Sequence, residues 1–185
     1  KASEKRYGDF RDRFLEKRYL INVASLTPQK NHRLLLRVFH QLVTGNDRYS
    51  DLKLILLGEG ECLDGLRDLC VELGLTAFEK GRKTPIGSEQ VYFLGYESNP
   101  YPLFRHATLL VMTSLWEGLP IALLEGMSLG VPGVISDCSE GIRSVWKVPH
   151  SDKLRNNSKA SCHWMPYGAL IDGLNNDVET INTWA

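Results

Sequence analysis

The chain has 185 residues, equal numbers of basic and acidic side chains, and therefore no formal net charge. This length suits one domain, or one and a half, and is enough to bury a sizeable core. The balanced charge argues against binding of nucleic acid or an anionic membrane through overall electrostatics. With 43% hydrophobic and 24% charged residues, the composition is that of an ordinary globular domain.

The four cysteines, Cys62, Cys70, Cys138 and Cys162, form no C-x-x-C pair. Such spacing favours free thiols in a reducing compartment over a disulfide framework or a zinc site. No apolar run approaches the roughly 20 residues of a membrane helix, and no signal peptide precedes the first strand. These features predict a cytoplasmic protein.

The chain begins with Lys1 and ends in what resembles an unfinished helix, so we expect a piece of a longer protein. Within residues 1–18, Tyr7, Phe10 and Phe14 share one helical face. This pattern predicts a connector helix from a missing N-terminal domain. Residues 19–185 then form the main domain, truncated at its C-terminal end.

From residue 19 onward, short apolar runs alternate with amphipathic runs. We expect strands over residues 19–24, 52–57, 90–94, 108–112, 133–136 and 167–171, and helices over 31–43, 61–73, 101–106, 120–129 and 140–146. Strands this continuously apolar belong to a sheet covered on both faces. The predicted fold class is therefore α/β, with a Rossmann-like, doubly wound parallel sheet.

Two polar and basic segments interrupt the alternation, at residues 76–88 and 146–166. The first contains Gly81, Pro85 and Gly87 and predicts a mobile loop. Neither segment has the interleaved aromatic residues or the motif of a nucleic-acid patch, so both are expected to be solvated loops.

In open parallel sheets, ligands bind beyond the carboxyl ends of the strands. At the first such junction, residues 24–31, Lys30 lies beside a predicted helix N-terminus, which suits a phosphate. A solvated lysine in a turn capped by Asn31 is an equally good interpretation of this segment alone. The second junction, Gly58-Glu59-Gly60, lacks the rest of a dinucleotide fingerprint and predicts a tight turn rather than an NAD site.

The third junction places Glu117 and Glu125 in a markedly apolar segment. A buried carboxylate needs a partner or a ligand. If Pro120 is the first helical residue, Glu117 precedes the helix and Glu125 lies roughly 7 to 8 Å along its axis. Carboxylates accept hydrogen bonds from sugar or ribose hydroxyls, and Gly118 lets a ligand approach the backbone closely.

The alternative is that Glu117 caps the helix dipole and that Glu125 pairs with a neighbouring base. Each glutamate alone favours this alternative, whereas the two together, with a glycine and a proline between them, favour a ligand site.

These residues resemble a known family. Glu117-Gly118-Leu119-Pro120, followed by Leu124-Glu125-Gly126-Met127, is similar to the E-x7-E region of retaining glycosyltransferases of family 4, the group 1 glycosyltransferases. Residues 24–31 resemble the family's G-R-L-x-x-x-K-N segment, and residues 58–60 and 91–95 its G-x-G turn and V-x-F-L-G strand. The matches keep their order from about residue 20 to residue 145.

The resemblance implies the carboxy-terminal, nucleotide-sugar-binding domain of a GT-B enzyme, which has two facing Rossmann-like domains. The donor would be a nucleotide-diphosphate sugar, and the acceptor a polysaccharide, lipopolysaccharide or glycolipid, as in capsule synthesis. The missing N-terminal domain would hold this saccharide or lipid-linked acceptor. The resemblance further implies peripheral association of the full-length protein with the inner face of the membrane.

The resemblance also implies roles for single residues. Glu117 would bind the donor sugar, Gly118, Leu119 and Pro120 would line the sugar and phosphate, and Glu125 would hold the ribose hydroxyls. Lys30 would contact the diphosphate and neutralise the leaving group. The chain has no D-x-D motif, which implies a metal-independent site without a further cofactor.

One position departs from the family pattern. Ser25, at the donor-binding junction, stands where the family has an arginine. Either another base, such as Arg82, Lys83 or Arg143, replaces this arginine, or activity is weaker, or the chain belongs to a branch without it.

Two other functions remain as alternatives. One is another GT-B enzyme, such as an epimerase or phosphorylase. The other is a non-catalytic nucleotide-binding or signalling module, which the sequence disfavours because the strands end in Ala24, Gly58, Gly95 and Thr113 rather than in an acidic cluster.

Overall fold

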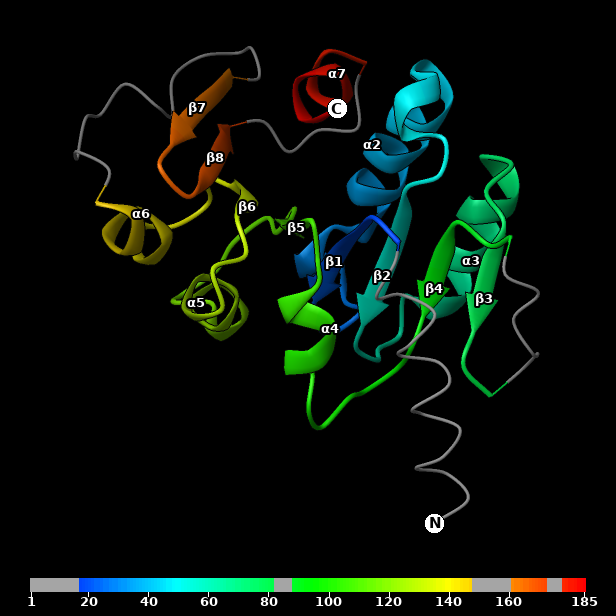
Figure 1. The fold of residues 1–185 in the computed structure, drawn as a ribbon, viewed down its shortest axis with the longest axis horizontal. Helices are drawn as coiled ribbons and strands as arrows, with labels where there is room; N and C mark the ends of the chain where they lie inside the picture. Colours follow the sequence, from blue (N-terminus) through cyan, green and yellow to red (C-terminus); the bar gives the residue numbers. More distant parts are fainter. Residues whose placement is uncertain (1–16, 82–87, 148–160, 173–177) are drawn as a thin grey trace.

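The computed structural model describes residues 17–81, 88–147, 161–172 and 178–185, and these residues form one sheet with helices on both sides (Figure 1). The strand order is β3-β4-β2-β1-β5-β6-β8-β7. The strands are β1 Tyr19–Val23, β2 Lys53–Leu57, β3 Ala77–Glu79, β4 Val91–Phe93, β5 Leu109–Met112, β6 Gly133–Ser136, β7 Ser161–Met165 and β8 Gly168–Asp172. Neighbouring strands are parallel, except that β7 is antiparallel to β8.

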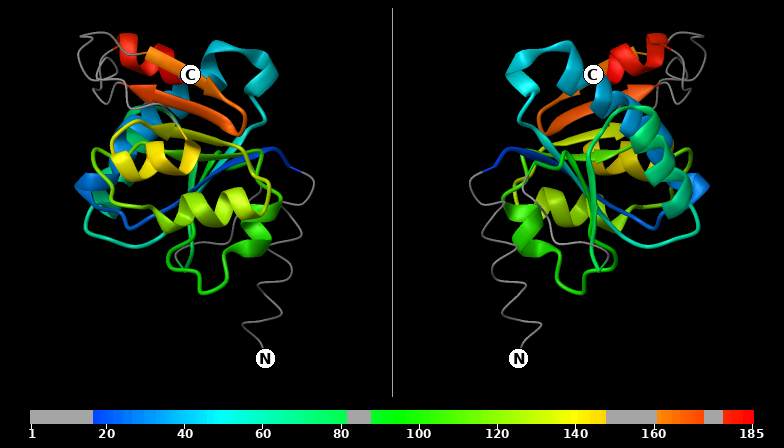
Figure 2. Two further views of the ribbon diagram at one scale, coloured as in Figure 1. Left: turned by 90° about the vertical axis from the view of Figure 1, so that its left-hand side faces the viewer. Right: turned by 90° about the vertical axis from the view of Figure 1, so that its right-hand side faces the viewer.

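The helices cover the sheet in two layers, as the two end-on views in Figure 2 show. They are α2 His32–Gly45, α3 Leu63–Glu72, α4 Tyr101–Arg105, α5 Ile121–Ser128, α6 Glu140–Trp146 and α7 Val178–Trp184, with 3-10 turns at Pro28–Lys30 and Asp47–Tyr49. Alternate residues of a strand point to opposite faces. Leu54 and Leu56 of β2 accordingly join the core under α2 and α3, whereas Ile55 joins the core under α4, α5 and α6. Two separate cores confirm the predicted doubly wound α/β fold.

The path of the chain through the sheet creates a topological switch point. The order β4-β2-β1-β5-β6-β8 is that of the six-stranded Rossmann sheet, to which β3 and β7 are added at the two edges. From β1 the chain moves outward through β2, and it later returns to β5 on the other side of β1. Ligands bind at such a switch point, beyond the carboxyl ends of the two central strands.

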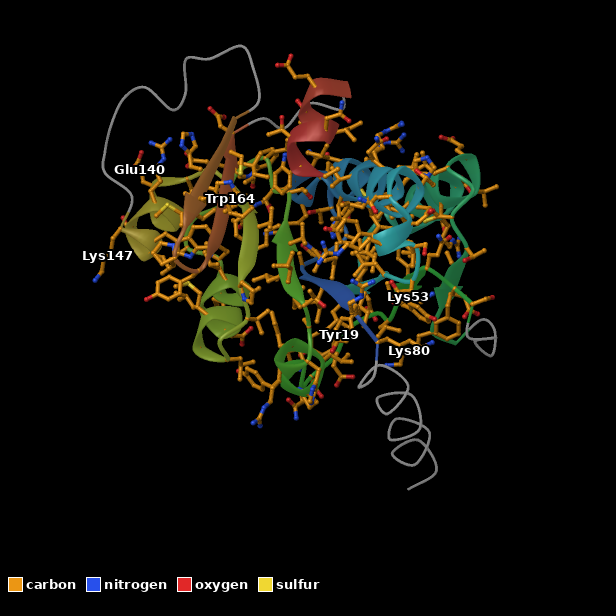
Figure 3. All side chains as sticks on the ribbon, turned by 45° about the horizontal axis from the view of Figure 1, so that its top comes forward. Tyr19, Lys53, Lys80, Glu140, Lys147 and Trp164 are labelled. Carbon is orange, nitrogen blue, oxygen red and sulfur yellow. The ribbon has the colours of Figure 1, made fainter. Side chains whose placement is uncertain are left out.

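Two predicted loops contain edge strands, so the loop prediction was wrong for residues 77–79 and 161–165. In β3 only Phe78 is buried, and a three-residue strand is too short to show an alternating pattern. In β7 the large apolar side chain of Trp164 is 81% exposed on the outer strand (Figure 3). Residues 82–87 and 148–160, and most of the predicted connector helix, lie outside the described residues.

The helix boundaries differ slightly from the prediction: α2 begins at His32 rather than at residue 31, and α5 begins at Ile121 with Pro120 as its N-cap. All four cysteines are free thiols. Among the described residues, no helix combines the length and the apolar character needed to cross a membrane.

Candidate functional site

At the switch point, hydrogen bonds join the segment after β1 to the segment after β5. The Leu115 amide donates to the Gln29 carbonyl at 2.8 Å, and Gln29 Nε2 donates to the Trp116 carbonyl at 2.7 Å. The Thr113 hydroxyl donates to the Lys30 carbonyl at 3.1 Å. Two segments distant in the sequence thus form a single unit beyond the carboxyl ends of β1 and β5, where a ligand is expected.

This unit brings together two predicted site residues, Lys30 and Glu117. Lys30 Nζ lies 2.7 Å from Glu117 Oε1, and the two side chains are only 17% and 7% exposed. The Ser114 hydroxyl donates to the same oxygen at 2.7 Å. Sequence reasoning missed Ser114; its place at the end of an apolar strand, three residues before Glu117, was the available signal.

The pairing overturns two of the alternatives considered from the sequence. Lys30 is not a solvated lysine, and the hydrogen-bond partners of Glu117 are Lys30 and Ser114 rather than the start of α5. Asn31 does not cap α2 with its side chain; it has φ 49° and ψ 43°, which turns the chain out of the 3-10 turn and into α2. An ammonium has three donors, and within the described residues only one of those on Lys30 makes a hydrogen bond.

The Gly58-Glu59-Gly60 turn packs directly against the segment that leads to Lys30. A Cβ atom on Gly58, which has φ +144°, would lie 1.9 Å from the carbonyl oxygen of Ala24. A Cβ atom on Gly60 would lie 2.4 Å from the carbonyl oxygen of Leu26. Both positions therefore require glycine: Gly58 for its positive φ and for space, and Gly60 for the close approach of the Leu26 carbonyl. The exposed Ser25 lies between these two contacts.

Glu125 lies on α5 and has a different partner from Glu117. The Tyr101 hydroxyl, at the start of α4, donates to Glu125 Oε1 at 3.0 Å. This hydrogen bond, followed by the charge of Glu125, raises the pKa of Tyr101. The alternative in which Glu125 pairs with a base is therefore wrong for the described residues, since its partner is a phenol.

The peptide between the two glutamates has one packed side and one open side. The Ser139 hydroxyl donates to the Gly118 carbonyl at 3.1 Å, and a Cβ atom on Gly141 would lie 2.1 Å from that oxygen. A Cβ atom on Gly118 itself would meet nothing within 4 Å. Leu119 is 54% exposed beside it, whereas Pro120 is buried. The Gly118 backbone is therefore held by α6 and faces open space.

Arg143, one suggested replacement for the arginine absent at position 25, is already occupied. Its Nε and Nη2 atoms donate to the two carboxylate oxygens of Asp137 at 2.7 and 2.9 Å, and its side chain is 7% exposed. Arg82 and Lys83 lie outside the described residues. Among those described, no group of three His, Cys, Asp or Glu side chains is placed to hold a metal ion.

The model of the family described as "Glycosyl transferases group 1" matches residues 9–149. The chain belongs to the group 1 glycosyltransferase family. It is 35% identical to an uncharacterized glycosyltransferase of Methanocaldococcus jannaschii over 77% of its own length and 30% of the relative. It is 31% identical, over 71% of its length and 31% of the relative, to a Campylobacter jejuni enzyme named N-acetylgalactosamine-N,N'-diacetylbacillosaminyl-diphospho-undecaprenol 4-alpha-N-acetylgalactosaminyltransferase.

Solved structures of GT-B glycosyltransferases share the fold of this group 1 glycosyltransferase chain. Staphylococcus aureus TarM, in a complex that contains UDP, has a TM-score of 0.63 and 20% identity over 91% of this chain and 28% of TarM. Anabaena HepE, in complex with UDP-glucose, has a TM-score of 0.55 and 22% identity over 70% of this chain and 32% of HepE. The chain spans about 30% of the length of the two relatives named above.

Proposed function

We propose that this chain is the carboxy-terminal, donor-binding domain of a GT-B glycosyltransferase of family 4 that transfers a sugar with retention of configuration. Its donor is a nucleotide-diphosphate sugar, and its acceptor a polysaccharide, lipopolysaccharide or glycolipid. The observation that carries the proposal is the Lys30–Glu117 pair at the switch point, beside the open face of Gly118. A cation, a carboxylate and an accessible backbone suit a phosphate joined to a sugar.

The geometry supports a division of roles. Lys30 gives one N–H to Glu117 and directs the others to the diphosphate, where its charge stabilises the departing nucleotide. Within the described residues, Glu117 Oε2 makes no hydrogen bond to the protein. In the proposed complex this oxygen accepts a hydrogen bond from a hydroxyl of the donor sugar. Glu125 accepts from the ribose hydroxyls. The site uses neither a metal ion nor a further cofactor.

The names of relatives support the substrate class. TarM and HepE have structures with UDP or UDP-glucose, and the Campylobacter relative is named for a diphospho-undecaprenol acceptor. We place the full-length protein at the cytoplasmic face of a membrane, with the acceptor held mainly by an N-terminal domain. The 185-residue chain alone should then show little transferase activity, and product analysis on the full-length protein separates a transferase from an epimerase or phosphorylase.

The proposal is tested by calorimetric titration of the purified protein with UDP, GDP and ADP. At least one nucleotide should bind, and Lys30→Gln and Glu125→Gln should each weaken binding about tenfold or more, as expected for a lost charge-assisted contact. Glu179→Gln is the matched control, because this exposed glutamate lies on α7, against the opposite face of the sheet. A folded protein that binds none of the three nucleotides would contradict the proposal.

A further inference from the structure

The contact between Tyr101 and Glu125 joins two helices that follow different strands. Tyr101 opens α4, which follows β4, and Glu125 lies on α5, which follows β5. The two helices pack against each other on one face of the sheet (Figures 1 and 2). The Tyr101 side chain is 47% exposed, so its hydroxyl meets Glu125 near the surface, on the helix that starts at the switch point.

The distance between these two helices is set by buried packing next to the contact. A Cβ atom on Gly126, the residue after Glu125, would lie 3.3 Å from Phe104 Cε1 and 3.0 Å from Leu110 Cδ2. Phe104 is fully buried and lies one helical turn after Tyr101 on α4. A close-packed glycine therefore holds α5 against α4 where the phenol and the carboxylate meet, and the hydrogen bond is part of a defined interface.

The hydrogen bond determines which part of the Glu125 carboxylate remains available. The phenol donates to Oε1 at 3.0 Å, and among the described residues Oε2 has no hydrogen-bond partner. A glutamate free in solvent samples several rotamers, and binding must then restrict them. Because the tyrosine already restrains the carboxylate, less conformational entropy is lost when a hydroxyl of a ligand binds to it.

We propose that Tyr101 is a positioning residue that orients Glu125 toward ribose hydroxyls and so increases the preference of the site for ribonucleotides over deoxyribonucleotides. This inference rests on the proposed function, in which Glu125 binds the ribose. Tyr101 contributes through Glu125 rather than through its own contact with the ligand. Its effect should therefore disappear when either Glu125 or the ribose hydroxyls are removed.

The test is a titration of wild type, Tyr101→Phe, Glu125→Gln and the double variant with UDP and with its 2',3'-dideoxy analogue, or with the matching pair for GDP or ADP. Tyr101→Phe should weaken binding of the ribonucleotide about fivefold, the size of one net hydrogen bond, and leave binding of the dideoxy analogue unchanged. In the Glu125→Gln background it should have no further effect. Tyr167→Phe is the control, since this exposed tyrosine precedes β8 and so lies at the amino ends of the parallel strands, whereas the switch point lies beyond their carboxyl ends.

The outcomes separate the two levels of the proposal. If Tyr101→Phe weakens binding of both nucleotides equally, or weakens binding of neither, Tyr101 has no positioning role. If the wild type still binds the ribonucleotide more tightly than the dideoxy analogue, the proposed function stands in either case. Wild type that binds no nucleotide, or binds both forms equally, overturns the role of Glu125 and with it the inference.

Discussion

Lys30 Nζ and Glu117 Oε1 lie 2.7 Å apart, although 87 positions separate the two residues in the sequence. The contact joins the segments that follow β1 and β5, so it stabilises the carboxyl end of the sheet, where the ligand is proposed to bind. Loss of either side chain should affect both stability and binding. The two effects must be measured separately before a loss of binding is attributed to a lost ligand contact.

Lys30→Met should lower the free energy of unfolding by about 1–3 kcal/mol, because it leaves the largely buried Glu117 carboxylate with only the Ser114 hydroxyl. Adding Glu117→Gln should restore part of this loss, since the unpaired charge is then gone. Urea unfolding of the two single variants and the double variant measures the coupling. Strictly additive losses would show that the pair contributes nothing to stability.

The sequence singled out Lys30 and Glu117, which the structure brings together, because both residues follow apolar strands at recognisable junctions. Glu117 stands in an apolar segment, and Lys30 precedes an amphipathic helix, so each position was identified locally. That the two form an ion pair depends on strand order, and no local pattern contains strand order. The same limit explains why Tyr101, the partner of Glu125, was missed, whereas Ser114 lies only three residues before Glu117 and could have been found from the local sequence.

The fold was predictable where strands are buried on both faces and not where they lie at an edge. Leu54 to Leu57 form a continuous apolar run because helices cover both sides of β2. The edge strands β3 and β7 lack that requirement. In β3 only Phe78 is buried, and none of the residues 162–165 of β7 is buried, so neither strand has a buried apolar run that the sequence could reveal. The sequence did not show that position 141 requires glycine, because this requirement arises from the contact of Gly141 with Gly118 in the folded chain.

Gly118→Ala should leave stability nearly unchanged and weaken nucleotide-sugar binding about tenfold. The added methyl group meets no protein atom within 4 Å, but it projects into the space that the donor is proposed to occupy. Thermal unfolding and titration with the donor measure the two effects. Unchanged donor affinity would show that the ligand does not approach this backbone.

Gly141→Ala should have the opposite profile and destabilise the protein by about 1–3 kcal/mol, since the methyl group would overlap the Gly118 carbonyl and force α6 away. Gly65→Ala is the matched control. Gly65 lies within α3 with nothing within 4 Å of its added Cβ atom, so alanine there should stabilise by up to about 1 kcal/mol. If both variants gain stability in thermal unfolding, the contact between α6 and Gly118 is not as close as described.

His32 provides a prediction about pH. It is 2% exposed, and its Nε2 lies 2.9 Å from Asn22 Oδ1. Because Asn22 Nδ2 donates to the Val111 carbonyl, Oδ1 is an acceptor and His32 Nε2 carries the proton. Its buried Nδ1 has no hydrogen-bond partner among the described residues. Burial, and then the charge of Lys30, lower the pKa of His32 to about 4.

Below pH 6.5 the unfolded chain therefore takes up a proton at His32 that the folded protein takes up only near pH 4. The unfolded state binds more protons in this window, so stability should fall as the pH falls through it, by up to about 3 kcal/mol from this residue. Urea unfolding at several pH values should show a smaller decrease for His32→Gln, which keeps a donor for Asn22 but does not titrate. Parallel curves for the two proteins would contradict this role.

The most direct measurement of the proposed donor site is an NMR titration of the 15N-labelled protein with the nucleoside diphosphate that binds. Binding at the switch point predicts shifts of the amide signals of residues 25–27 and 29–31, of Gly118 and Leu119, and of Glu125, with little change in the hairpin of β7 and β8. Shifts confined to that hairpin, or no shifts in a folded protein at saturating nucleotide, would contradict a donor site built on Lys30 and Glu117.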